Sequence, residues 1–196
     1  LRDLAPEVGQ RVGREHLLEL DAAVAAEGFD LADIVFPLVD KQGCVTVKTN
    51  FYSVPARAGT RVEARVYPLH VEIWHAGHLI ARHERCHSRR QHVLDLEHYL
   101  DVLGQKPGAF AGSKPLAQWR AAGRWPVCYD ELWDRLRARH GKQNGTRAMV
   151  EVLGLGREFG HDALRAAVAS TVSLGACDVA AVRYLLTEAG LHKAIP

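Results

Sequence analysis

Closely spaced cysteine pairs are missing from this chain. Its four cysteines, Cys44, Cys86, Cys128 and Cys177, lie forty or more residues apart, and no C-x-x-C pair occurs. Small secreted domains that depend on disulfides are usually much denser in cysteine. The pattern therefore predicts reduced, mostly buried thiols in a cytoplasmic protein.

Membrane and export signals are also lacking. The longest apolar runs are far too short to cross a bilayer, so no membrane partner is expected. Residues 1–10 already carry charges and a proline, which argues against a signal peptide. With 196 residues, 47% hydrophobic and 24% charged, the chain can form one large globular domain or two small ones. It begins with leucine instead of Met, and we expect a fragment of a longer protein.

No catalytic constellation is present in the sequence. Gly154 and Gly156 do not belong to a G-x-x-x-x-G-K phosphate loop, no serine lies in G-x-S-x-G, and no Cys–His dyad can be placed. We therefore expect a binding and scaffolding protein that is not an enzyme by itself and needs no cofactor.

Short runs of alternating residues between positions 43 and 90 predict a small β-barrel. The expected strands are 45–47, 51–54, 61–66 and the two arms of a hairpin, 71–73 and 79–80. Ala76-Gly77 supplies the tight turn of the hairpin, and Leu79 or Ile80 supplies its apolar side. About five strands this close together are typical of an antiparallel, SH3-like barrel that is closed or nearly closed.

A helix and a connector are expected before this barrel. Residues 11–27 place Leu17, Leu20 and Val24 on one helical face. Pro37 would break any helix in the connector that follows.

From residue 91 onward the strand signal gives way to helical spacing. Short loops separate the helical runs, which predicts a bundle. Thr146 and Asp178 are placed as N-caps of two of its helices. The predicted architecture is therefore α+β, with segments 1–42 (helix and connector), 43–90 (barrel) and 91–196 (helical domain).

A set of short strings spreads over residues 34–187. They are Gly43-Cys-Val-Thr-Val-Lys-Thr-Asn-Phe-Tyr-Ser-Val-Pro55, Val71-Glu-Ile-Trp-His-Ala-Gly-His78, Ile80-Ala-Arg-His83, Val93-Leu-Asp-Leu-Glu-His-Tyr-Leu100, Lys106-Pro-Gly-Ala109, Gly145-Thr-Arg147 and Val182-Arg-Tyr-Leu-Leu186. Together they resemble the C-terminal region of IstA-type insertion-sequence transposases, which belong to the DDE (retroviral-integrase-like) superfamily. The Asn-x-Tyr-Ser-Val-Pro string followed by a hairpin is the most specific of them.

The resemblance implies a barrel that follows a catalytic domain, and after it helices that contact terminal DNA or partner subunits. Family members also carry a helix-turn-helix region and an RNase-H-like domain whose three carboxylates bind Mg, and they work with an AAA+ helper ATPase. Neither domain fits before Cys44, and the carboxylates Asp21, Glu27, Asp30 and Asp33 cannot be assigned to the triad. We expect a segment or truncated copy that does not cut or join DNA on its own.

Basic residues gather where the barrel ends. Residues 82–90 hold four arginines against one glutamate, in a chain whose net charge is only +2. Guanidinium groups suit bidentate phosphate contacts, and such contacts release counterions from DNA. A solvated charged face is the other interpretation. The expected DNA-binding residues are Lys48, Arg57, Arg82, Arg85, Arg89 and Arg90.

Three further clusters have simpler structural explanations. A second basic group consists of Arg135, Arg137, Arg139, Lys142 and Arg147. A favourable interaction with a helix C-terminus explains the first three without a ligand, and this explanation is preferred to DNA contact. Seven histidines between residues 70 and 98 suggest zinc, but their spacing lacks the paired ligands of structural sites, so no metal is expected. Three tryptophans, Trp119, Trp125 and Trp133, are expected to pack the bundle instead of stacking on bases.

The leading hypothesis is a DNA-binding and assembly region of a transposase. The barrel would contact double-stranded transposon ends, and the helices would mediate homo-oligomer formation or docking of the AAA+ helper. The alternative is a protein-interaction module that dimerises or docks the helper without touching DNA. A third hypothesis, a metal hydrolase using the histidines, predicts bound zinc.

Overall fold

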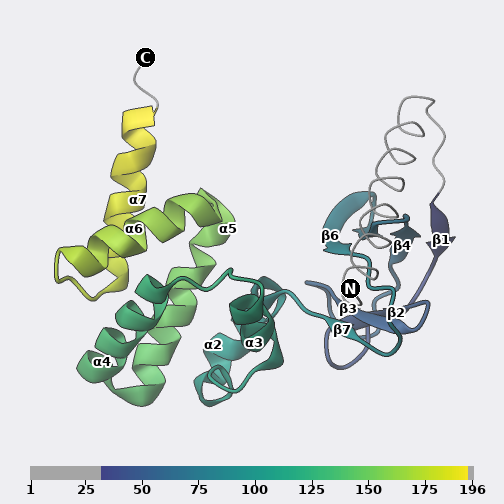
Figure 1. Ribbon diagram of the computed structural model, residues 1–196, viewed down its shortest axis with the longest axis horizontal. Coiled ribbons are helices and arrows are strands. Elements are labelled where there is room, and N and C mark those ends of the chain that lie inside the picture. The colour runs from purple at the N-terminus through teal and green to yellow at the C-terminus, as the bar shows by residue number, and fades with distance from the viewer. Residues whose placement is uncertain (1–31, 194–196) are drawn as a thin grey trace, which may run out of the picture. The chain divides into compact units, whose positions relative to one another are not determined.

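The computed structural model describes residues 32–193, and the side chains of residues 32–188 (Figure 1). The helix predicted at residues 11–27 lies outside the described residues. The described residues divide into two compact units, and the boundary falls between Val93 and Leu94.

The first unit contains two β-sheets. One sheet has the order β1-β4-β5-β6 and is antiparallel; its strands are β1 (Asp33–Val35), β4 (Glu63–Val66), β5 (His70–His75) and β6 (His78–Glu84). The other has the order β2-β3-β7; its strands are β2 (Cys44–Val47), β3 (Asn50–Ser53) and β7 (His92–Val93). Inward side chains from both sheets, among them Val45, Val71 and Ile73, form one hydrophobic cluster. This shared core holds the two sheets together.

The strands expected from alternation are present, but the barrel is not confirmed. Among the described residues the ladders form two separate sheets and no closed barrel is found. Two strands are additional: β1 arises inside the expected connector, and β7 pairs parallel with β3 in a sheet expected to be antiparallel. A strand of two or three residues is too short to show alternation in the sequence.

The predicted hairpin is confirmed, and its ladder contains one β-bulge. Its turn places Ala76 and Gly77 at φ 49° and 78°. A bulge between Ile73 and Trp74 puts Ala81 opposite Ile73. Leu79 therefore points outward with 46% of its surface exposed, and Ile80 packs partly against the core.

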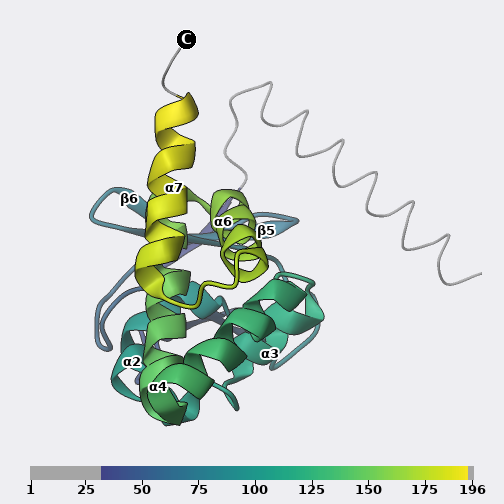
Figure 2. The same cartoon turned by 90° about the vertical axis from the view of Figure 1, so that its left-hand side faces the viewer.

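The second unit is helical. Its elements are η1 (Leu96–Tyr99), α2 (Leu100–Gln105), η2 (Pro107–Ala109), α3 (Lys114–Ala121), α4 (Val127–Gly154), α5 (Gly156–Phe159), α6 (His161–Ser173) and α7 (Val179–Lys193). Helices α6 and α7 pack on each other and on α4 (Figure 2). The three tryptophans are buried in this core, as predicted. Within the described chain, no helix combines the length and apolar character needed to span a bilayer.

Helix α4 is bent at Gly141, whose φ of 79° and ψ of 167° are not helical. The helix resumes directly after this residue, so the prediction that Thr146 is an N-cap is wrong. Thr146 is buried, and its hydroxyl accepts a hydrogen bond from Trp133 Nε1 and donates one to the Lys142 carbonyl. The cap predicted at Asp178 is confirmed, because its carboxylate accepts the Ala181 N–H at 2.7 Å.

Candidate nucleic-acid interface

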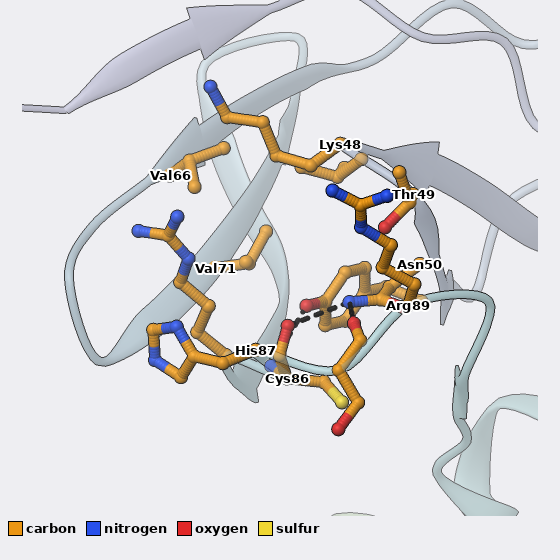
Figure 3. Close-up of a pocket in the computed structure, with 12 residues that line it drawn as sticks. Lys48, Thr49, Asn50, Val66, Val71, Cys86, His87 and Arg89 are labelled. Carbon is orange, nitrogen blue, oxygen red and sulfur yellow. Dashed lines mark hydrogen bonds between the residues drawn. The ribbon is translucent and has the colours of Figure 1, made fainter.

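A pocket of about 340 Å³ lies between the β2–β3 turn and the chain that follows β6 (Figure 3). Its lining residues are Val47, Lys48, Thr49, Asn50, Tyr52, Val66, Val71, Arg85, Cys86, His87, Ser88 and Arg89. Lys48, His87 and Arg89 lie around Val66 and Val71 in the close-up. The pocket thus combines an apolar floor with a rim that carries three cations and a histidine.

The buried side chain of Asn50 fixes one wall of this pocket. Its amide nitrogen donates hydrogen bonds of 2.7 Å to the carbonyl oxygens of both Cys86 and Ser88, and its amide oxygen accepts the Gln91 N–H at 3.0 Å. The Tyr52 hydroxyl accepts the Cys86 N–H at 3.1 Å. The Asn-x-Tyr string therefore serves as the anchor of the segment 86–91, which carries Arg89 and Arg90.

Backbone hydrogen bonds complete this attachment. The Arg90 N–H donates to the Thr49 carbonyl at 3.1 Å, and the Phe51 N–H donates to the Gln91 carbonyl at 2.8 Å. The basic segment is thus held along the β2–β3 turn, so that cations about forty residues apart in the sequence line one pocket.

Two of the basic residues have an unfavourable backbone conformation. Lys48 and Arg90 have φ values of 55° and 58°, and among the described residues only Ala76 is another non-glycine with positive φ. Glycine takes this conformation without steric cost, whereas other residues lose roughly 1 kcal/mol or more. A long basic side chain is therefore present at two positions where the fold alone would favour glycine.

The pocket cations differ in their partners. Lys48 Nζ lies 2.7 Å from Asp33 Oδ2, and Arg85 donates to the Tyr67 carbonyl at 3.0 Å. Within the part of the chain that the structure describes, neither Arg89 nor Arg90 forms an ion pair. The two arginines of segment 86–91 are thus available to an external anion.

The other predicted DNA-binding residues do not line the pocket. Arg82 projects from β6, 60% exposed, with its Nε 3.9 Å from Glu72. Arg57 is exposed in the loop after β3, and exposed Arg90 is adjacent to the pocket residue Arg89. The structure brings together Lys48, Arg85 and Arg89; DNA contact by any of the six residues stays a prediction.

The second basic cluster is largely engaged within its own unit. Arg135 donates to the Val172 carbonyl at 2.7 Å, Arg137 pairs with Asp134 and lies 4.7 Å from the Trp133 ring centre, and Arg139 contacts Cys177 and Asp178. Arg147 donates to the Gly104 carbonyl and to Asn144. These contacts account for the four arginines of the cluster without a ligand.

The histidines are dispersed instead of gathered. Buried His83 bonds to the Ser53 carbonyl at 2.7 Å, and His92 stacks on Phe51 with ring centres 4.6 Å apart. Over residues 32–193, no group of three or more His, Cys, Asp or Glu is placed to hold a metal ion. The described histidines thus offer no assembled set of ligands.

Comparison with known proteins shows which class of protein the chain resembles. Residues 24–95 match the family described as Mu transposase, C-terminal domain. Two curated relatives named Transposase for insertion sequences IS1326/IS1353, from Pseudomonas aeruginosa and Shigella flexneri, are each 35% identical over 156 residues. A transposase from Aminobacter aminovorans is 33% identical over 130 residues, which is 63% of this chain and 24% of that relative. No solved structure matches the chain.

These matches confirm a C-terminal transposase region, as the resemblance indicated. More narrowly, the curated relatives to which the chain is similar include transposases of insertion sequences. Each alignment with the IS1326/IS1353 transposases covers 75% of this chain but only 29% of the relative.

Proposed function

We propose that this chain is a non-catalytic DNA-binding and assembly region that acts in insertion-sequence transposition. In this proposal its β unit contacts the phosphate backbone of double-stranded DNA at the transposon ends. Lys48, Arg85 and Arg89 make the central contacts, and Arg90 extends them. The helical unit mediates assembly with further copies of the chain or with an AAA+ helper ATPase.

One observation carries the proposal: cations from two distant segments line a single pocket on a rigid support. Lys48 comes from the β2–β3 turn, whereas Arg85 and Arg89 follow β6. The hydrogen bonds of Asn50 hold these two segments together. Contacts to phosphate fix the position of a protein on DNA but read no sequence, so we expect weak discrimination between duplexes.

The strained backbone is a second argument for a role of the side chains. Positive φ at Lys48 and Arg90 is a cost that glycine would remove. Residues in sparsely populated conformations cluster at functional sites. The presence of basic residues at both positions, in spite of this cost in stability, supports a role of their side chains in binding an anion.

The test is a titration of a labelled transposon-end duplex with wild-type protein and with Arg85, Arg89 and Arg90 all changed to Ala. Each lost cation weakens a phosphate contact, so the triple variant is expected to bind at least tenfold more weakly at moderate salt. Its matched control removes the same charge from the helical unit, by changing Arg120, Arg157 and Arg183 to Ala. These three arginines are exposed and already paired with Asp130, Asp101 and Glu158.

The control variant is expected to retain wild-type affinity. Equal losses in both triple variants would mean that net charge alone governs binding. No loss in the variant of the β unit would remove the phosphate proposal.

A protein-interaction module is the second candidate. It is favoured by an apolar row that β1 and the following residues expose: Ile34, Phe36 and Leu38 are 50%, 56% and 52% exposed. Sedimentation of wild type and Phe36→Ser over a range of concentrations tests self-association. A dimer that is lost in Phe36→Ser, together with absent duplex binding, would favour this candidate.

A further inference from the structure

Asp33 lies at the edge of the cationic pocket. It is the first residue of β1 and is paired in register with Val66, which lines the pocket. Its Oδ2 lies 2.7 Å from Lys48 Nζ, and the two side chains are 68% and 52% exposed. The pocket lysine is therefore already in contact with an anionic group of the protein itself.

A second pocket cation also acts on this carboxylate. The hydrogen bond from Lys48, followed by the charge of Lys48, lowers the pKa of Asp33, and the charge of Arg85 acts in the same direction. Asp33 is thus ionised at neutral pH and is attracted by two of the three cations of the pocket.

The contact between Lys48 and Asp33 is of a kind that exchanges readily. Ion pairs between exposed side chains contribute little to stability, and the lysine ammonium is a point charge on a flexible stem. A phosphate group carries the same sign of charge and more acceptor oxygens than a carboxylate. At about 340 Å³ the pocket has room for such a group beside the cations.

We propose that this pocket is a discrete site for one phosphate group of a DNA strand, and that the Asp33 carboxylate takes the place of that phosphate on Lys48 while the protein is free. Binding then exchanges one anion for another: Lys48 leaves Asp33 and joins Arg85 and Arg89 on the phosphate. This inference rests on the proposed function, because it names the ligand group and a built-in competitor at the same site.

The exchange predicts that removal of the competing carboxylate strengthens binding. Asp33→Asn is expected to raise the affinity for a labelled duplex about two- to fivefold, the scale of an exposed ion pair. The matched control is Glu63→Gln, because Glu63 also pairs with a cation of the same sheet, Arg65 at 2.6 Å, yet neither residue lines the pocket. The control variant is expected to bind with wild-type affinity.

A double-mutant cycle separates competition from a general effect of charge. If Asp33 acts by holding Lys48, its removal gains nothing once Lys48 is changed to Met. Equal gains from Asp33→Asn and Glu63→Gln, or a gain that persists in the Lys48→Met background, would overturn the exchange. Neither result would affect the proposed function, which depends on the arginine variants.

Inorganic phosphate tests the pocket without DNA. At constant ionic strength, phosphate is expected to raise the unfolding temperature of Asp33→Asn more than that of wild type, and Arg89→Ala is expected to cancel this protection. If phosphate protects wild type, Asp33→Asn and Arg89→Ala equally, or protects none of them, a discrete phosphate site is overturned even if duplex binding is observed. Protection without duplex binding would keep the site and reject the proposed function.

A phosphate at the end of a strand offers anionic oxygens of the same kind as one within it, with a higher negative charge. Duplexes with and without a terminal 5′ phosphate are therefore compared. Equal affinity assigns the site to a backbone phosphodiester, and tighter binding of the phosphorylated duplex assigns it to the strand end. Both results support the phosphate site.

Discussion

The side-chain amide of Asn50 donates a 2.7 Å hydrogen bond to the carbonyl oxygen of Cys86, across a sequence separation of 36 residues. Further bonds link the same side chain to Ser88 and Gln91. This buried amide thus makes three of the hydrogen bonds that hold the basic segment in place. If the proposed function is correct, DNA affinity will depend on this uncharged residue as well as on the cations.

We predict that Asn50→Ala destabilises the β unit by about 2 kcal/mol, because it removes three hydrogen bonds between a buried side chain and the backbone of Cys86, Ser88 and Gln91. Duplex affinity is expected to fall as well, since segment 86–91 is no longer held in place. Urea unfolding and duplex titration measure the two effects.

Val62→Ala is the control for this loss of stability. Val62 is buried in the same hydrophobic core, and its backbone N–H bonds to the Pro37 carbonyl instead of to segment 86–91. It is expected to destabilise the unit to a similar extent while duplex affinity stays unchanged, provided both variants are fully folded in the assay. The same affinity in wild type and Asn50→Ala would show that the anchor does not matter for binding.

Because the backbone of Arg90 is strained and its side chain is cationic, replacing it with glycine should affect stability and DNA binding in opposite directions. Arg90→Gly is expected to leave stability unchanged or raise it by up to about 1 kcal/mol, because glycine tolerates the φ of 58°, and to weaken duplex binding. Ala76→Gly relieves the same kind of strain at φ 49° without removing a cation, so it should leave binding unaltered. A comparable loss of affinity in both variants would contradict this account.

Asp95 gives the helical unit a dependence on pH. Burial raises the pKa of its carboxyl, but the hydrogen bonds from Arg124 and the Glu97 N–H outweigh this and lower it below 3.8. Because the pKa is lower in the folded protein, the stabilisation is fully present above the ordinary value and is lost as the pH falls through the folded value.

Accordingly, Asp95→Ala is expected to cost about 1 kcal/mol at neutral pH, through loss of the cap on η1 and of the Arg124 pair. The deficit should shrink as the pH falls below 3.8. Asp95→Asn keeps a capping side chain and should lose less. Denaturant unfolding followed by tryptophan fluorescence at a series of pH values measures this, and a deficit that does not vary with pH would refute it.

Gly145 lies close to the backbone of the part of α4 that precedes the bend. A Cβ at this position would lie 2.5 Å from the Leu136 carbonyl oxygen and 2.6 Å from the Arg137 Cα, both backbone atoms. We predict that Gly145→Ala destabilises the helical unit by about 2 kcal/mol or more. Gly154→Ala, in the same helix with no neighbour within 4 Å, should instead stabilise it slightly. Similar unfolding curves for both variants would argue against the close approach.

The sequence predicted features that depend on local pattern. Alternation located β2, β4 and the hairpin, and Asp178 was recognised as a cap because its position relative to the helix is a local property. Thr146 looked equally suitable, but the non-helical Gly141 lets the helix restart earlier, so that Thr146 becomes buried.

Features that depend on distant contacts were missed. The Asn-x-Tyr string stood out in the sequence, but its partners Cys86 and Gln91 lie 34 to 41 residues away, and no local period connects them. The arginines could be predicted as a group, whereas only the fold shows that Arg85 and Arg89 meet Lys48 and that Asp33 pairs with it. Charge counts along a chain do not reveal which ions share a pocket.

The central claim is that the pocket cations contact DNA phosphates, and the salt dependence of binding tests it most directly. Each phosphate contact contributes about 0.9 to the slope of the logarithm of affinity against the logarithm of salt concentration. Changing both Arg85 and Arg89 to Ala is therefore predicted to reduce the slope by about 2, whereas changing Arg120 and Arg157 leaves it unchanged. An unchanged slope in the pocket variant would contradict the claim.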